Sequence, residues 1–486
     1  MSFNSLVFLI YLPIVILIYF LLPFKGRWFF LLIASYFFYA YANPWLLLLI
    51  SSTTLVSYLC SLGIEKTRKK GLKNLLFALA LIFLFGMLFV FKYLDFAIAS
   101  AVSLMNLFGS QTTFSGFHLL LPVGISFYTF QTLGYVIDVY QGKIKAESHL
   151  GYFALFVSFF PQLVAGPIER PQDLLPQLKE KHNFTLDNFS SGLHSMLIGY
   201  LKKIVIADFL GTYVNRIYGD VFSSSGASLL IATFFFALQI YGDFSGYSDI
   251  AIGIARIMGI RLSQNFDHPY RSKSVREFYR RWHITLNRWF IDYLYIPLGG
   301  SRSSPFRHVL NILIVFLVSG FWHGARWNFV LWGVLNGIFV VLETLLDKPF
   351  GKWKNKKEAR KRIIDVLSVP FTFLLLSATW VFFRSPDVET AFVVYQRVFT
   401  SFRMGKGLES FTDFTFVLRV VLSITLLILL PYLPKLDFSK DRNGQYNIKR
   451  ISSSLVIYVA LIFLISYAWA SQLATGGESG FIYFQF

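Results

Sequence analysis

Long apolar runs recur from one end of the chain to the other, separated by short polar and basic stretches. Most of them extend over roughly 17 to 25 residues, the length that a helix needs to cross the hydrocarbon core of a bilayer. The pattern predicts an all-α polytopic membrane protein with eleven to thirteen spans, some of them re-entrant. The expected spans lie near residues 5–23, 29–43, 45–63, 74–94, 119–140, 150–166, 189–208, 227–242, 309–322, 327–345, 364–383, 413–433 and 452–470.

Composition and charge agree with this interpretation. Of 486 residues, 55% are hydrophobic and only 15% are charged, a profile typical of a polytopic membrane protein. The net charge of +19 comes mainly from basic stretches between the apolar runs, which the positive-inside rule assigns to cytoplasmic loops. Because contact with anionic headgroups explains them, we expect no nucleic-acid binding. These stretches are 65–73, 271–288, 347–362 and 435–450.

Prolines and glycines gather within or beside the apolar runs of the middle part of the chain. Helix breakers at membrane depth are tolerated only where the backbone is buried in protein or lines a cavity, so we expect the chemistry here. We expect one membrane domain over 1–486, and its tail faces outward if the basic stretch before the last span is cytoplasmic. Its expected parts are scaffold helices at 1–116, a catalytic core at 119–345, covering helices at 364–470 and an extracytoplasmic tail at 471–486.

His323 lies inside the apolar, aromatic stretch Ser319–Gly333, directly after Trp322. An imidazole is costly in hydrocarbon, so an intramembrane histidine is a functional-site hypothesis by default. We therefore take His323 as a candidate catalytic residue. The alternative is a histidine that only forms a hydrogen bond between helices.

A second histidine, His283, lies in the basic stretch 276–288. Helical spacing places it with Arg276 and Arg280 on one face of an amphipathic helix that leads into a short re-entrant segment. In one interpretation, this helix is only an interfacial anchor with a basic face. In the functional interpretation it forms a cationic mouth for an anionic cytosolic substrate that carries phosphates.

Two carboxylates, Asp243 and Asp249, lie in a polar stretch between apolar runs. Intramembrane carboxylates are expensive unless they are paired, so we expect structural ion pairs or a role in orienting a histidine rather than direct catalysis. The candidate partners are Arg256, Arg280 and Arg281. Gln162, beside two prolines, is expected to line the site as a structural polar group.

The spacing of the histidines and the single cysteine exclude other chemistry. No two histidines have the i, i+4 spacing of a helical metal site, so we expect no metal. Cys60 lies in an apolar run and is expected to be a small packed hydrophobe, which leaves no candidate for a thiol nucleophile.

Five long segments occur in an order that resembles the membrane-bound O-acyltransferase family, in particular its bacterial branch of alginate and peptidoglycan O-acetyltransferase membrane subunits. The resemblance covers nearly the whole chain. The segments are GISFYTFQTLGYVIDVY (124–140), FFPQLVAGPIER (159–170), QIYGDFSGYSDIAIGIARIMGI (239–260), NFDHPYRSKSVREFYRRWHITLNRWFIDYLYIPLGG (265–300) and FWHGARWNFVLWG (321–333).

The resemblance implies the fold of that family, with a funnel on each side of the cytoplasmic (inner) membrane of a bacterium. The family's membrane histidine falls on His323, and the second position of its catalytic motif falls on His283. It also implies acetyl-CoA as a cytosolic acyl donor, no permanently bound cofactor, and delivery of the acetyl group to an extracytoplasmic polysaccharide.

Residue chemistry fits acetyl transfer from a thioester to a hydroxyl, which needs a base and donors for the developing oxyanion. Neutral histidine suits the role of base at neutral pH, and we assign this role to His323. His283 would contact the thioester carbonyl or act on His323 indirectly. Trp322, Trp327 and Asn328 are expected to shape and dry the pocket. The expected ligands of the coenzyme A phosphates are Arg276, Arg280, Arg281 and Arg288, because guanidinium matches phosphate geometry.

The chain ends in GGESGFIYFQF, with Tyr483 as the hydroxyl among the last six residues. An aqueous tail with so many aromatic and aliphatic side chains is expected to bind something. One interpretation is an anchor in the aromatic belt of the membrane. In the other, the tail folds back to His323, since sixteen extended residues reach roughly 50 Å. A similar motif occurs on the small partner of the related lipoteichoic-acid D-alanylation enzyme, which implies that Tyr483 is an acyl carrier serving a secreted SGNH-type transferase.

Other functions remain as alternatives. D-alanyl or another acyl transfer to a cell-envelope acceptor would use the same fold. A transporter or flippase would also have broken helices and midplane polar groups, but the inverted repeats that it predicts are not apparent in the sequence. A scaffold that only recruits a secreted enzyme would function without His323.

Overall fold

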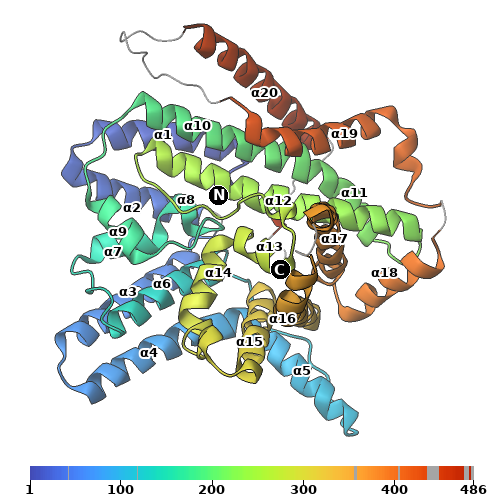
Figure 1. Cartoon of the computed structure of the whole chain (residues 1–486). Coiled ribbons are helices and arrows are strands. Elements are labelled where there is room, and N and C mark those ends of the chain that lie inside the picture. Colours follow the sequence, from blue (N-terminus) through green and yellow to red (C-terminus); the bar gives the residue numbers. More distant parts are fainter. Residues whose placement is uncertain are drawn as a thin grey trace. The chain divides into compact units, whose positions relative to one another are not determined.

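The computed structural model describes residues 1–41, 43–117, 119–354, 358–402, 405–434, 448–474 and 481–482 (Figure 1). Within these ranges the chain is helical and has no β-strand, apart from one isolated bridge between Phe266 and Trp282. The prediction of an all-α fold is therefore confirmed. The helices divide between two compact units that are not consecutive stretches of the chain, because α10, α12 and α20 each contribute to both.

Unit 1 contains residues 1–197, 247–263 and 435–455, and unit 2 contains the others. In unit 1 the structure describes α1 (Leu6–Leu21), α2 (Phe24–Ala40), α3 (Leu46–Lys66), α4 (Lys70–Leu88), η1 (Phe89–Tyr93), α5 (Leu94–Leu107), α6 (Ile125–Tyr140), α7 (Leu150–Ser158), α8 (Phe160–Leu163), α9 (Pro171–Lys179) and most of α10 (Leu186–Tyr200).

Unit 2 begins at Ile198, in the last turn of α10, and carries both candidate histidines. Its described helices are η2 (Leu201–Asp208), α11 (Phe209–Tyr218), α12 (Gly226–Ile257, shared), η3 (Pro269–Arg271), α13 (Val275–Arg281), α14 (Ile284–Phe290), η4 (Ile291–Tyr295), η5 (Gly300–Arg302), α15 (Pro305–His323), α16 (Trp327–Lys354), α17 (Glu358–Arg384), α18 (Val388–Thr400), η6 (Glu409–Thr412), α19 (Phe414–Leu429), η7 (Leu430–Tyr432) and α20 (Ile448–Ala474, shared).

Eight helical stretches in the described residues are long and apolar enough to cross a membrane, so the chain is a multi-pass membrane protein. They are Leu46–Lys66, Lys70–Leu107, Gly226–Ile257, Pro305–His323, Trp327–Leu346, Lys361–Arg384, Phe414–Tyr432 and Ser454–Gln472. The count falls below the predicted eleven to thirteen because several predicted spans are short or broken helices. Leu6–Leu21, for example, is apolar but shorter than the others.

The breaks lie where the sequence places proline and glycine. The expected span at 150–166 divides into α7 and α8 just before Pro161. The expected span at 119–140 becomes helical only at Ile125, because Gly124 has a left-handed φ of 77° that few other residues tolerate. A Cβ on Gly124 would also lie 2.7 Å from the carbonyl oxygen of Leu163, which shows how closely the two segments approach.

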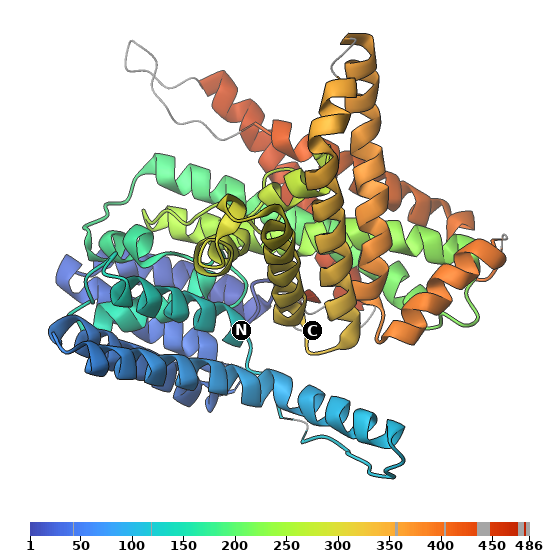
Figure 2. The ribbon, with the colours of Figure 1, turned by 60° about the horizontal axis from the view of Figure 1, so that its bottom comes forward.

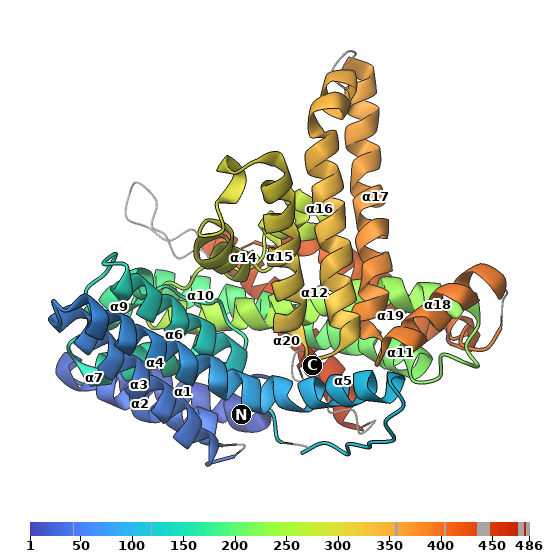
Figure 3. The same ribbon diagram turned by 90° about the horizontal axis from the view of Figure 1, so that it is seen from below.

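Within unit 1, α3 packs against both α4 and α6, and α2 packs against α7 (Figure 1). Cys60 is buried in α3, as expected for a packed hydrophobe. Within unit 2, α15, α16 and α17 lie side by side, with α16 between the other two (Figures 2 and 3). These three helices build the surroundings of His323.

Candidate active site

His323 is the last residue of α15, and the chain turns into an extended conformation at Gly324. Only 6% of the His323 side chain is exposed. Its imidazole packs edge-on against three aromatic rings, with centroid distances of 4.9 Å to Trp322, 5.1 Å to Trp332 and 5.4 Å to Phe383. The histidine therefore lies in a dry aromatic enclosure supplied by α15, α16 and α17.

Two glycines let α15 and α16 approach each other next to this histidine. A Cβ on Gly320 would lie 2.4 Å from the carbonyl oxygen of Phe329, and one on Gly333 would lie 2.4 Å from that of Phe316. Small residues of this kind allow close backbone contact between membrane helices. The position of His323 is thus set by a tight two-helix hairpin.

Trp322 lies between the two candidate histidines. Its ring centroid is 5.8 Å from that of His283 and 4.9 Å from that of His323. Sequence positions forty residues apart therefore meet in one cluster within unit 2. The structure brings together the two histidines to which the resemblance assigned catalytic positions.

The prediction that Arg276, Arg280 and His283 share a helical face is wrong. The helix α13 ends at Arg281, and His283 has a left-handed backbone with φ 46° and ψ 55°. The break is fixed from outside the helix: the side-chain amide of Asn287 donates to the carbonyl oxygens of Tyr279 and Trp282. This turn directs the His283 side chain into the core, where it is 1% exposed.

Asn265 defines the tautomer of His283. Its Oδ1 accepts from the backbone N–H and the hydroxyl of Thr285, so this atom is an acceptor, and the His283 Nδ1 at 3.1 Å must donate to it. Neutral His283 then carries its lone pair on Nε2. An acceptor nitrogen cannot stabilise a thioester oxyanion, which favours the indirect role for His283 over the contact to the carbonyl.

Burial lowers the pKa of His283 from 6.5 to about 3. The folded protein therefore binds fewer protons than the unfolded chain between these values, and the contribution of His283 to the free energy of unfolding falls as the pH decreases through this window. In detergent, wild type should lose more thermal stability between pH 6.5 and 4.5 than His283→Asn, whose asparagine tolerates the left-handed backbone. Equal losses in the two proteins would contradict a buried neutral imidazole.

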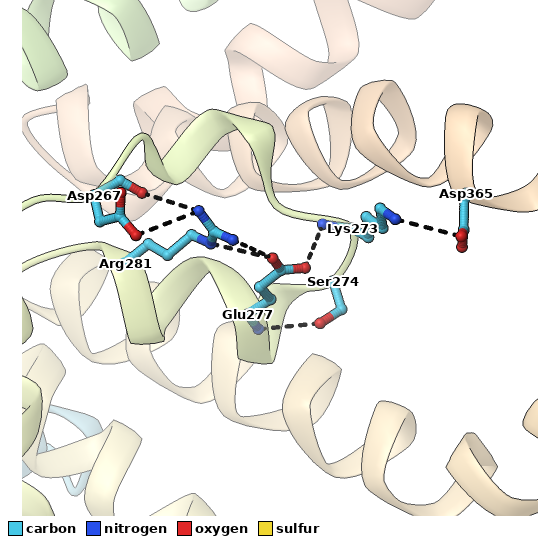
Figure 4. Close-up of polar contacts among 6 residues, drawn as sticks. All are labelled: Asp267, Lys273, Ser274, Glu277, Arg281 and Asp365. Carbon is cyan, nitrogen blue, oxygen red and sulfur yellow. Dashed lines mark hydrogen bonds and ion pairs between the residues drawn. The ribbon is translucent and has the colours of Figure 1, made fainter. Parts of the chain in front are cut away.

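Three of the four predicted phosphate-binding arginines divide into a paired group and an exposed group. Arg281 is paired with Glu277 at 2.9 Å and with Asp267 at 3.5 Å (Figure 4). The neighbouring Ser274 caps α13 by accepting the N–H of Glu277. Arg280 and Arg288, in contrast, are exposed.

The remaining contacts at α13 fix its start. The carboxylate of Glu343 accepts the N–H groups of Val275 at 2.6 Å and Arg276 at 2.9 Å, where the helix dipole favours negative charge. Lys273 forms an ion pair with Asp365 at 3.3 Å (Figure 4). Helix α13 is thereby tied to α16 and α17, the helices that enclose His323.

Asp243 is buried in α12 and is paired, as expected, but not with an arginine. Its Oδ1 lies 2.5 Å from the Nζ of Lys203, which also pairs with Asp208 at 2.8 Å. The predicted partner Arg281 is engaged elsewhere, and Arg256 pairs with Asp187 in unit 1. The prediction of an arginine partner is therefore wrong for Asp243.

Tyr483 lies outside the described residues, but the two residues directly before it are described. Phe481 and Ile482 are 4% and 3% exposed. The N–H of Ile482 donates to Asp243 at 2.6 Å, and the Phe481 ring lies 5.9 Å from that of Phe244. Phe244 in turn packs on His283 at 4.8 Å. The tail thus returns to the histidine cluster within unit 2.

The other predicted site residues take varied positions. Trp327 begins α16 and is 56% exposed. The tryptophan of α16 that packs against His323 is Trp332, in the role that was predicted for Trp327. Asn328 is buried and donates to the carbonyl oxygens of Phe382 and Ser385, which closes the end of α17.

Two further polar residues belong to unit 1. Gln162 is buried and donates to the carbonyl oxygen of Phe156 at 2.9 Å. Asp249 lies half-buried in the last part of α12. Among the described residues, no group of three His, Cys, Asp or Glu side chains is arranged to hold a metal ion.

The sequence interpretation missed Asn265 and Lys203. Lys203 is an ionisable residue in an apolar run at 189–208, so the rule that marked Asp243 would have marked it too. Asn265 gave a weaker signal, because a single asparagine between two helices usually belongs to a turn. Its role as the hydrogen-bond partner of His283 depends on the tertiary contact between the segment at 265 and the turn at 283.

Comparison with known proteins identifies similar sequences. The family model for the membrane-bound O-acyltransferase family matches residues 144–383. The chain is 35% identical over 499 residues to the probable alginate O-acetylase AlgI of Pseudomonas putida, covering 100% of both chains. It is 34% identical over 426 residues to the peptidoglycan O-acetyltransferase of Helicobacter pylori, covering 81% of this chain and 78% of that one.

A more distant similarity links the chain to the teichoic acid D-alanyltransferase of Bacillus subtilis. The two are 26% identical over 268 residues, which is 53% of this chain and 67% of that one. The part of the chain that the family model matches contains both His283 and His323.

Proposed function

Because the chain belongs to the membrane-bound O-acyltransferase family, we propose that it transfers an acetyl group from cytosolic acetyl-CoA to the phenol of Tyr483, for O-acetylation of an extracytoplasmic polysaccharide. That the chain is a membrane O-acyltransferase follows from the family and its relatives. The observation that supports the finer proposal is the buried return of Phe481 and Ile482 to the ring that packs on His283.

The proposed step uses His323 as general base. Its imidazole takes the phenolic proton of Tyr483 as the oxygen attacks the thioester carbonyl, the C–S bond breaks, and the coenzyme A thiolate leaves and takes up a proton. The product is an acetyl ester of tyrosine. The dry aromatic enclosure supports this role because water excluded from the site cannot hydrolyse the intermediate.

The exposed Arg280 and Arg288 are the best candidates to bind the coenzyme A phosphates, because Arg281 is already paired. Arg280→Gln should raise the KM for acetyl-CoA roughly tenfold, the loss expected for a charged hydrogen bond, with little effect on kcat. Steady-state release of free coenzyme A thiol measures both constants when the partner transferase and a polysaccharide are present to remove the acetyl group from Tyr483.

Arg281→Gln is the matched control in the adjacent position. It should lower thermal stability by breaking the pairs with Glu277 and Asp267 and leave the KM for acetyl-CoA nearly unchanged. If the two variants raise the KM for acetyl-CoA equally, the assignment of the coenzyme A phosphates to Arg280 rather than Arg281 is wrong.

We propose a secreted or periplasmic SGNH-type transferase as the partner that moves the acetyl group from Tyr483 to a polysaccharide hydroxyl. Relatives named for alginate and peptidoglycan acetylation support a polysaccharide as final acceptor. On the same basis, we propose the cytoplasmic (inner) membrane of a bacterium as the location.

The decisive experiment uses the full chain in nanodiscs with acetyl-CoA labelled in the acetyl group. We expect label on a C-terminal peptide that contains Tyr483, together with release of one free thiol for each acetyl bound. The similarity to a teichoic acid D-alanyltransferase makes D-alanyl transfer the second candidate. Labelling from a D-alanyl thioester but not from acetyl-CoA would contradict acetyl transfer and favour D-alanyl transfer. Movement of acetyl groups across the membrane without thiol release would also contradict the proposal, because a transporter predicts that result.

A further inference from the structure

A buried ion cluster of Lys203, Asp208 and Asp243 lies in unit 2, outside the aromatic enclosure of His323. All three side chains are nearly inaccessible to solvent. A buried lysine is stable only when it is paired, and here it lies 2.8 Å from Asp208 and 2.5 Å from Asp243. A buried carboxylate has two oxygens, so Asp243 can accept from a further hydrogen-bond donor besides Lys203.

That donor comes from the end of the chain. The second carboxylate oxygen of Asp243 accepts the backbone N–H of Ile482 at 2.6 Å, 239 residues away in sequence. Hydrogen bonds to a charged acceptor are about twice as strong as neutral ones, and burial strengthens them further. Since the donor is a backbone group, the contact fixes the path of the chain rather than one side chain.

The shape of the neighbouring helix explains how the lysine reaches this place. Lys203 lies in the π-helix η2, a form that occurs frequently at functional sites. Gly242 lets η2 approach α12, since a Cβ there would lie 3.0 Å from the carbonyl oxygen of Lys202. The carbonyl oxygen of Ile204, on the same π-helix, accepts a hydrogen bond from the side-chain amide of Gln472 near the end of α20. The last helix and the tail are therefore both attached around η2.

We propose that Asp243, held by Lys203, is a positioning residue that fixes the C-terminal segment through the backbone of Ile482, directly before the proposed acyl carrier in the sequence. This inference rests on the proposed function for its purpose, but the docking itself can be measured without any acyl transfer. The tail is bound on one side through Ile482 to Asp243 and on the other through Phe481 to Phe244.

The test exploits the single cysteine of the chain. In a Cys60→Ala background, Ile482→Cys introduces one thiol that keeps the backbone N–H, and a water-soluble maleimide reports its exposure in the intact protein. Adding Asp243→Ala should raise the labelling rate roughly tenfold to hundredfold, the scale of losing one charge-assisted hydrogen bond. Asp243→Asn keeps an acceptor oxygen and should give an intermediate rate. Equal rates in all three proteins would overturn the proposal.

A second pair of variants leaves the ion cluster intact, which matters if Asp243→Ala fails to fold. Ile482→Pro removes the donor N–H, whereas Ile482→Val keeps it. With Phe481→Cys as reporter in the Cys60→Ala background, the proline variant should label at least tenfold faster than the valine variant, with unchanged elution in gel filtration. Similar labelling of the two would show that the hydrogen bond does not hold the tail.

Activity then separates this inference from the proposed function. With the natural Phe481 and Cys60, Ile482→Pro should lower kcat and leave the KM for acetyl-CoA unchanged, because the acceptor is displaced and the donor site is not. If labelling follows the expectation and no acetyl is found on Tyr483, the carrier role fails and the docking stands. If Tyr483 is acetylated and labelling is insensitive to Asp243, the docking fails and the carrier role stands.

Discussion

His323→Ala should lower the rate of thiol release from acetyl-CoA by roughly a hundredfold to ten-thousandfold, the contribution of a general base. The KM for acetyl-CoA should change little, since the imidazole acts on the acceptor proton and not on the coenzyme. The aromatic rings around it can close over the small cavity, so the variant should still fold. Thiol release by the full chain in nanodiscs measures the effect.

His308→Ala is the matched control, because this histidine lies on the same helix α15 near its beginning. It should retain wild-type kcat. A His323→Ala protein that elutes as a single species and keeps more than a tenth of wild-type activity would contradict a general-base role for His323 and favour a histidine that only packs between helices.

Tyr483→Phe should abolish both the labelled C-terminal peptide and the transfer of acetyl to polysaccharide, because phenylalanine has no oxygen to accept the acyl group. Labelling of the protein from acetyl-CoA, followed by peptide mass analysis, measures the first effect. Tail docking through the Ile482 N–H should persist, since that contact does not involve the phenol.

Tyr467→Phe is the control, because this tyrosine of α20 is exposed on a membrane-spanning helix. It should remain fully active. Full polysaccharide acetylation by Tyr483→Phe would leave the tail as an anchor and would require the final acceptor itself to reach His323.

Hydrophobic patterning was sufficient for the helical class, because apolar runs long enough to span a bilayer have few other solutions. It was less reliable for counting spans, since hydropathy does not register that Gly124 starts a helix late or that a proline divides a run. His323 was visible as an expensive group in an apolar run. Its partner rings Trp332 and Phe383 were not, because they come from two other helices.

The surroundings of His283 and Asp243 were beyond a linear reading. Helical spacing from Arg276 to His283 was regular, and nothing local predicts that Asn265 and Asn287 will stop the helix from outside. Likewise, the partner of Asp243 lies forty residues upstream on a helix of different pitch. Such contacts depend on tertiary packing, which overrides local propensity.

The glycine contact between α15 and α16 has a kinetic consequence. With the backbone of Gly320 against Phe329 and that of Gly333 against Phe316, the hairpin has no clearance for one helix to slide past the other. His323 is then held in a fixed position, so in the proposed reaction the thioester of the donor and the C-terminal segment must both come to it. Turnover would then depend on how often the donor thioester reaches His323 while the C-terminal segment is docked, and a change in the docking or in the length of the donor arm would change the rate without altering the histidine.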